Sequence, residues 1–261
     1  MSVVLIGGVE ASLYCLKALA FDGAPISLVV GYPESLFTRA GYVSMRGACN
    51  LFSIPLLETE DINAPEVVER IKAAKPKLLV VTGWSQLLKK PLLDLGAVGL
   101  HPTRLPEGRG RAPIPWTLIK GLQRSAASLF HLTAGVDDGD IIGQIEFDIT
   151  DADDASSLYE KICEVYEKLV RRYVPMLLDG SAPRIPQDHS RATFWPRRRP
   201  EDGLIDWSKS PREIYNLVRG LSHPYPGAFT FCGGKRLTVW KARVRNELLE
   251  LLDVCVEECD A

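Results

Sequence analysis

The chain has 261 residues, of which 46% are hydrophobic and 25% charged, a composition typical of an ordinary globular protein. Its formal net charge of −2 argues against a protein that grips nucleic acid, for which a basic surplus is usual. The six cysteines lack metal-ligand spacing, and neither a signal peptide nor a membrane-spanning run is evident, so we expect a cytoplasmic protein without disulfides or bound metal.

The first half of the chain alternates short strand-like runs with helix-like segments. Apolar runs predict strands at 3–6, 26–30, 54–57, 78–81 and 98–100. This alternation predicts an α/β fold, a Rossmann-like and mostly parallel sheet with helices on both faces. Ligands of such sheets bind beyond the carboxyl ends of the strands, which places the candidate site around residues 7–8, 83–85 and 101–102. Gly7-Gly8-Val9 is not a GxGxxG turn, so the sequence gives a nicotinamide cofactor little support.

From residue 125 onward the pattern changes. Residues 126–133 and 141–149 read as two strands, and 155–178 as a long helix with apolar residues at helical spacing. Residues 181–200 are rich in proline and charge, which is typical of a linker. The remainder predicts a helix near 214–221 and a hairpin from 228–231 and 237–240. We therefore predict two domains, residues 1–190 and a small α+β domain at 191–261.

Four histidines are candidates for proton transfer at neutral pH. His101 follows a predicted central strand and opens a loop rich in glycine and proline, which makes it the strongest candidate. His131 falls inside a predicted strand and reads as structural, and His189 lies in the predicted linker. His223 precedes a proline in the small domain and ranks below His101.

An acidic loop, Asp137-Asp138-Gly139-Asp140, joins the two later strands. It reads either as a glycine-containing turn or as a cation site, although no further ligands stand at the expected spacing. A carboxylate that faced His101 would orient its ring and favour its protonated form. The residues alone do not place the two groups together.

Residues 99–116, GLHPTRLPEGRGRAPIPW, closely resemble the HPxxLPxxRGxxPxxW signature of the folate-dependent formyltransferases. This family includes methionyl-tRNA formyltransferase, glycinamide ribonucleotide formyltransferase and the sugar N-formyltransferases. Residues 137–142 resemble the family's DxGxI loop, and residues 198–207 and 225–229 are similar to the linker and second-domain entry of its longer members. The resemblance covers nearly the whole chain and implies the formyltransferase fold.

The resemblance implies that 10-formyltetrahydrofolate donates the formyl group and that no metal is needed. It makes His101 the general acid and base and Asp137 the carboxylate that holds and polarises its imidazole. The acceptor amine would attack the formyl carbon, and hydrogen bonds would stabilise the resulting oxyanion. The implied folate-binding residues are Trp84, Ser85, Gln86, Leu87, Leu88, Val136, Asp138 and Gly139.

The chain departs from the family pattern two residues before His101, where the family usually carries an asparagine and this sequence has Gly99. Losing a side-chain oxyanion donor typically costs about 3–4 kcal/mol of transition-state stabilisation. Either another donor replaces the asparagine, with Ser85 and Gln86 as candidates, or backbone amides and water suffice, or the protein is slow or inactive.

The small second domain and negative charge favour a nucleotide-linked (dTDP or UDP) amino sugar as the acceptor, without nucleic-acid or membrane partners. Glu10, Arg109 and Tyr225 are the candidate substrate contacts. The alternatives are a methionyl-tRNA formyltransferase and, because of Gly99, a non-catalytic protein that binds folate or a sugar nucleotide. The apolar tail at 248–252 either packs internally or forms a homodimer contact.

Overall fold

A computed structural model describes residues 2–37 and 40–258 and shows two compact units. The first contains residues 1–109, 126–146 and 162–193, and the second contains 110–125, 147–161 and 194–261. No helix among the described residues is long and apolar enough to cross a membrane.

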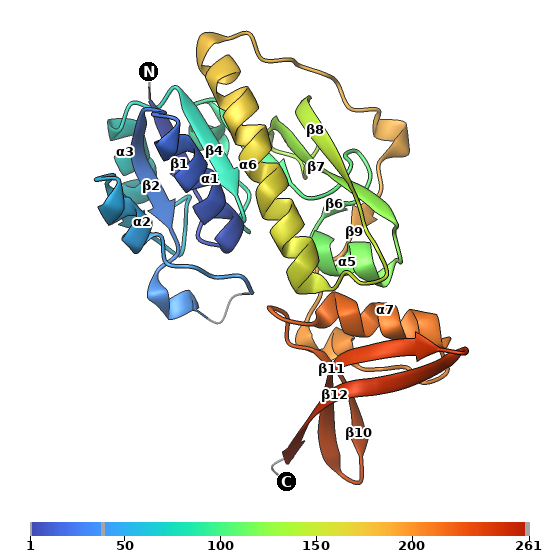
Figure 1. Ribbon diagram of the computed structural model, residues 1–261. Helices are drawn as coiled ribbons and strands as arrows, with labels where there is room; N and C mark the ends of the chain where they lie inside the picture. Colours follow the sequence, from blue (N-terminus) through green and yellow to red (C-terminus); the bar gives the residue numbers. More distant parts are fainter. Residues whose placement is uncertain (1, 38–39, 259–261) are drawn as a thin grey trace. The chain divides into compact units, whose positions relative to one another are not determined.

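A seven-stranded sheet organises the first unit, with strand order β3-β2-β1-β4-β5-β7-β8. The strands from β1 to β5 are parallel, and β7 runs antiparallel to β5 (Figure 1). This confirms the predicted mostly parallel α/β fold. The strands are β1 (Val3–Ile6), β2 (Ile26–Gly31), β3 (Leu56–Glu58), β4 (Leu78–Thr82), β5 (Ala97–His101), β7 (Arg124–His131) and β8 (Ile141–Asp148).

Helices cover both faces of this sheet because its central strands are apolar on both sides. On one face, α3 (Pro65–Ala73) packs Val67, Val68 and Ile71 into a core cluster with β1, β2 and β4. On the other face, Cys15 of α1 (Glu10–Phe21) is fully buried and lies near Cys163 of α6 (Ala155–Asp179). The shorter elements are η1 (Glu34–Leu36), α2 (Arg46–Leu51), α4 (Lys90–Leu93) and η2 (His189–Arg191).

The second unit is built around a three-stranded antiparallel sheet, β10-β11-β12. The expected hairpin thus gains a third strand, β12, which contains the apolar residues at 248–252. Leu249 packs against the core, whereas Leu248 and Leu252 are exposed. Its elements are α5 (Pro113–Ile119), η3 (Pro200–Gly203), α7 (Pro211–Leu221), β10 (Ala228–Cys232), β11 (Lys235–Arg245) and β12 (Leu248–Glu258). A two-stranded ribbon pairs β6 (Arg109–Gly110) with β9 (Phe194–Trp195).

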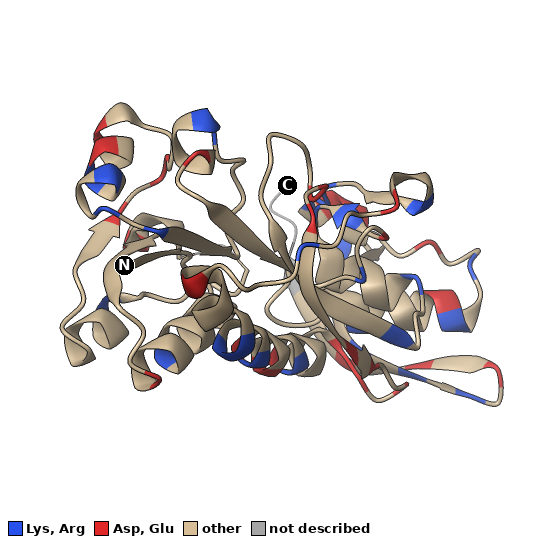
Figure 2. Ribbon diagram, turned by 90° about the horizontal axis from the view of Figure 1, so that it is seen from above, with Lys and Arg blue, Asp and Glu red and all other residues tan. Residues whose placement is uncertain are grey.

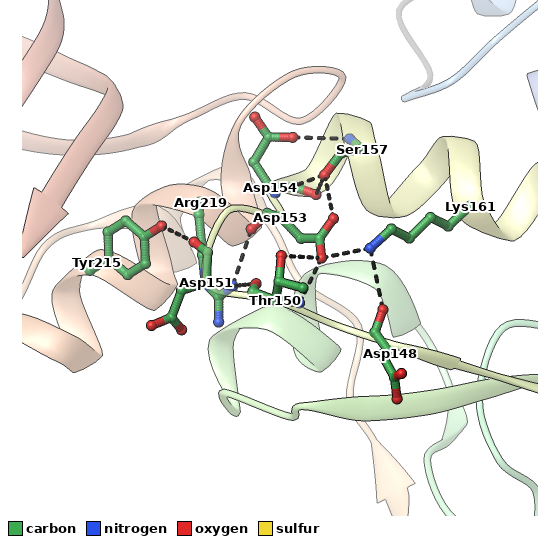
Figure 3. Close-up of polar contacts among 9 residues, drawn as sticks. All are labelled: Asp148, Thr150, Asp151, Asp153, Asp154, Ser157, Lys161, Tyr215 and Arg219. Carbon is green, nitrogen blue, oxygen red and sulfur yellow. Dashed lines mark hydrogen bonds and ion pairs between the residues drawn. The ribbon is translucent and has the colours of Figure 1, made fainter.

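Asp153, whose carboxylate is buried, connects the start of α6 to α7 within the second unit through its side chain and its backbone carbonyl (Figure 3). It accepts hydrogen bonds from Lys161 Nζ at 2.7 Å and from the Thr150 amide at 2.6 Å. Burial opposes its ionisation, but the hydrogen bonds from Lys161 and Thr150 outweigh burial and lower the pKa of Asp153 to about 2. Arg219 of α7 donates to the carbonyls of Thr150 and Asp153, at 2.9 and 3.1 Å.

Candidate active site

His101 ends β5, at the carboxyl edge of the parallel strands, and its side chain is buried. Its Nε2 lies 2.9 Å from the carbonyl oxygen of Gly108. Since a carbonyl only accepts hydrogen bonds, Nε2 carries the proton in this arrangement. Nδ1 lies 3.6 Å from Oδ2 of Asp137. The nitrogen that can take up or release a proton therefore faces a carboxylate.

The loop that carries Asp137 folds back along β5. It begins beside Ala97, the first residue of β5, where the Leu132 amide donates to the Ala97 carbonyl. Asp137 nevertheless lies beside His101, the last residue of β5. Asp137 has a φ of 50°, in the left-handed region that non-glycine residues seldom adopt. At Gly139 a Cβ would lie 1.9 Å from the His131 carbonyl oxygen, so only glycine allows this close backbone approach.

The other acidic residues of this loop have protein partners. The Thr133 hydroxyl donates to Asp138, and Arg184 forms an ion pair with Asp140 at 2.6 Å. No group of three potential metal-ligating side chains occurs among residues 2–37 and 40–258. Of the two readings of the acidic loop, these contacts favour the glycine-containing turn.

The segment after β4 places polar and apolar groups beyond the carboxyl end of that strand. The Trp84 ring stacks on Tyr32 with centroids 3.9 Å apart, and the Ser85 amide donates to the Tyr32 hydroxyl at 3.0 Å. Gln86 Oε1 accepts from the Ile62 amide at 3.0 Å. Leu88 is buried in the core cluster.

Apolar side chains remain available for a flat ligand at two of the predicted folate-binding positions. Leu87 is 57% exposed and Val136 is 39% exposed. Each lies on one of the two loops that carry the folate-binding residues implied by the family resemblance. Apolar side chains together with nearby backbone amides and carbonyls suit a planar heterocycle with hydrogen-bonding edges.

The three predicted substrate contacts have different surroundings. Glu10 is half-exposed in the first turn of α1. Arg109 is only 3% exposed, and its guanidinium donates to Gln187 Oε1 at 2.7 Å and lies 3.1 Å from His189 Nδ1. Tyr225 belongs to the second unit, where burial raises the pKa of its phenol.

The remaining histidines lie outside the His101–Asp137 pair. His131 ends β7, and burial lowers its pKa. His223 stacks on Trp240 in the second unit, with ring centroids 4.1 Å apart. Sequence reasoning did not single out Gln187, which is 6% exposed and contacts the Asp137 loop. A glutamine in a proline-rich linker carries no pattern that would have revealed it.

Comparisons with known proteins agree with this architecture. Residues 8–174 match the model of the formyl transferase family, and residues 198–250 match that of the formyl transferase C-terminal domain. The methionyl-tRNA formyltransferase of Syntrophus aciditrophicus (strain SB) is 36% identical over 248 residues, covering 93% of this chain and 79% of the relative.

Solved structures of two kinds share the fold. The methionyl-tRNA formyltransferase from Clostridium thermocellum superposes with a TM-score of 0.72 at 21% identity, covering 99% of this chain and 100% of that one. An N-formyltransferase from Helicobacter canadensis, in complex with folinic acid and dTDP-3-aminofucose, gives 0.72 at 15% identity, covering 94% and 88%. The chain belongs to the formyl transferase family, and is an enzyme that transfers a one-carbon group from N10-formyltetrahydrofolate.

Proposed function

We propose that the enzyme formylates the amine of a small, nucleotide-linked amino sugar. The observation that supports this proposal is the balanced charge of the second unit, which contains 15 Lys and Arg residues and 15 Asp and Glu residues. Figure 2 shows Lys and Arg interspersed with Asp and Glu along the ribbon of the described residues. A nucleotide sugar carries few phosphates, whereas a tRNA acceptor stem requires many simultaneous phosphate contacts from Lys and Arg.

In this proposal His101 and Asp137 perform the proton transfers. The Gly108 carbonyl fixes the ring with its proton on Nε2, and Nδ1 accepts the proton that the attacking amine releases. Asp137, 3.6 Å away, stabilises the positive charge that the ring then carries. Glu10, half-exposed at the start of α1, is the proposed contact for the acceptor's ammonium group.

The loops 84–88 and 136–139 are proposed to hold N10-formyltetrahydrofolate, which supplies the formyl carbon. Their fit rests on the exposed apolar side chains of Leu87 and Val136 and on the backbone groups beside them. In this proposal, the residues of the two loops bind the donor and orient it so that its formyl group faces His101.

Methionyl-tRNA formylation is the second candidate, favoured by the 36% identity to the Syntrophus enzyme. The balanced charge of the second unit weighs against it. A binding protein without turnover is the third candidate, because Gly99 supplies no side-chain donor beside His101.

A mass-spectrometric screen tests the three candidates. The protein is incubated with 10-formyltetrahydrofolate and nucleotide-linked amino sugars, free amino sugars or initiator methionyl-tRNA. We expect a formyl mass gain on one nucleotide sugar. His101→Ala should lower that rate about a hundredfold to ten-thousandfold, the usual contribution of a general acid–base group.

The other outcomes are equally informative. Formylation of the tRNA alone would overturn the sugar proposal and establish the second candidate. Folate binding without product on any acceptor would favour the binding protein. Unchanged turnover in His101→Ala would overturn the assignment of His101 whatever the acceptor proves to be.

A further inference from the structure

Both partners of the His101 imidazole lie on loops rather than on β5 itself. The Gly108 carbonyl faces Nε2 at 2.9 Å, and the Asp137 carboxylate faces Nδ1 at 3.6 Å. A hydrogen-bonded ring is oriented only as well as its partners are held. The contacts that fix these two loops therefore decide whether Nδ1 points toward the reacting amine.

Gln187 holds the loop that carries Asp137. Its Nε2 donates to the carbonyl of Asp137 at 2.9 Å and to that of Gly139 at 2.6 Å. Its Oε1 accepts from Arg109, from Nη2 at 2.7 Å and from Nε at 3.3 Å. Carbonyls only accept and a guanidinium only donates, so one orientation of the amide satisfies all four bonds.

The Asp137 backbone needs such support. Its φ of 50° puts it in the left-handed region, which costs a non-glycine residue about 1–2 kcal/mol. The bond from Gln187 is made to the carbonyl of this same residue. Holding the carbonyl of Asp137 fixes the direction of its Cα–Cβ bond and hence the position of the carboxylate.

The same chain segment also holds Gly108. The Thr193 hydroxyl accepts a hydrogen bond from the Gly108 amide at 2.8 Å, and the Thr193 carbonyl accepts one from the Arg109 amide at 2.9 Å. Arg109, the residue that follows Gly108, thus connects Gln187 to the loop that carries Gly108. Residues 187–193 hold both sides of the His101 ring.

We infer that Gln187 is a positioning residue for formyl transfer, acting through Asp137 on the His101 imidazole, with Arg109 as its anchor. Arg109 is then a support of the catalytic pair instead of a contact for the acceptor. This inference rests on the catalytic roles proposed for His101 and Asp137.

Gln187→Glu is the discriminating variant. A glutamate keeps the size of the side chain and its acceptor toward Arg109, but it cannot donate to the carbonyls of Asp137 and Gly139. Asn216→Asp is the matched control, because Asn216 is also 6% exposed and its Oδ1 accepts from Arg219 Nε at 2.9 Å. In both variants a carboxylic acid replaces a buried amide that faces an arginine.

We expect Gln187→Glu to lower turnover by roughly tenfold to a hundredfold, the size expected when a reacting group is slightly misplaced. Asn216→Asp should keep turnover near that of the unsubstituted enzyme. Thermal unfolding of both variants is measured alongside. Equal turnover in the two variants would overturn the inference. A loss of turnover in Gln187→Glu that is fully explained by its smaller fraction of folded protein would overturn it as well.

A second readout does not depend on the acceptor. Histidine ring nitrogens labelled with ¹⁵N report tautomer and hydrogen bonding, and His101→Ala assigns the His101 signals among the four histidines. We expect Gln187→Glu to shift the His101 signals and leave those of His223 in place. Unchanged His101 signals would overturn the inference. Full activity of His101→Ala would instead overturn the catalytic role proposed for His101, which separates that failure from a failure of the inference about Gln187.

Discussion

Leu132 fills the space in front of Gly99: a Cβ on Gly99 would lie 2.6 Å from Leu132 Cδ2. Gly99 and His101 are two residues apart on β5, so their side-chain directions lie on the same face of the sheet. This is the place at which the family pattern that residues 99–116 resemble has an asparagine. Here an apolar side chain occupies it, and the glycine makes room for that side chain.

Gly99→Asn is therefore expected to destabilise the enzyme by about 1–3 kcal/mol, because the new side chain overpacks the site. Gly99→Asn combined with Leu132→Ala should recover part of that loss, since the clash is with the end of the leucine side chain. Thermal unfolding of the two single variants and the double variant measures this. If the destabilisation of the double variant equals the sum of those of the two single variants, Leu132 is not what hinders a larger side chain at position 99.

Of the two candidates to replace the missing asparagine, Gln86 is the one that has an amide donor like that of asparagine. Its Oε1 is held by the Ile62 amide at 3.0 Å and by Trp84 Nε1 at 3.3 Å, which leaves Nε2 to donate. We expect Gln86→Ala to lower turnover about a hundredfold or more, the usual loss on removal of an oxyanion donor.

Ser85→Ala is the matched comparison for Gln86→Ala, and steady-state rates with saturating 10-formyltetrahydrofolate measure both variants. Rates like those of the unsubstituted enzyme in the two variants would mean that backbone amides or water stabilise the oxyanion.

Asp153 should make the stability of the enzyme depend on pH in the acid range. Its pKa is lowered from 3.8 to about 2 in the folded protein, so the stability it contributes is present above pH 4 and lost as the pH falls toward 2. The side chain is 5% exposed, and the shift corresponds to about 2 kcal/mol.

Urea unfolding at several pH values tests this dependence. Asp153→Asn should be less stable than the unsubstituted enzyme at pH 7, and the difference should shrink below pH 4. Asp148→Asn serves as the control, because that carboxylate is 84% exposed and should matter little. A difference that stays constant with pH would contradict the assignment.

The described cysteines should react with thiol reagents in two groups. Cys232 and Cys255 are exposed, whereas Cys15, Cys49 and Cys163 are buried. Burial, with a smaller contribution from Glu58, raises the pKa of Cys49 to about 11, which keeps it as the unreactive thiol. Iodoacetamide at pH 8 followed by peptide mass spectrometry should find Cys232 and Cys255 alkylated first. Early labelling of Cys15 would show that α1 detaches readily.

The strands from β1 to β5 could be predicted from the sequence because each contains a short apolar run. Val3–Ile6 is predicted to the residue, and the other strands of the seven-stranded sheet within two residues at each end. The extent of the small sheet was not predicted. The sequence of β12 does not alternate between apolar and polar residues, because Leu248 and Leu249 are adjacent, as are Leu251 and Leu252; Leu249 is packed, whereas Leu248 and Leu252 are exposed.

The pairing of His101 with Asp137 came from motif resemblance, since 36 residues separate them and no periodicity connects them. Gln187 and Leu132 were not predicted, because their importance comes from tertiary contacts. Arg109 illustrates the same limit. It is a candidate substrate contact in the sequence, its guanidinium is buried against Gln187, and only the structure shows which polar groups surround it.

The second unit gathers three separate stretches of chain, so its core is assembled from residues far apart in sequence. Gly220 of α7 closely approaches Ile119 and Leu118 of α5, and Arg219 bonds to residues that precede α6. A chimera made by exchanging everything after residue 190 would leave α5 and the start of α6 mismatched with the incoming α7. To exchange the whole second unit between relatives, an engineer would have to move 110–125 and 147–161 along with the C-terminal piece, which makes this enzyme resistant to modular recombination.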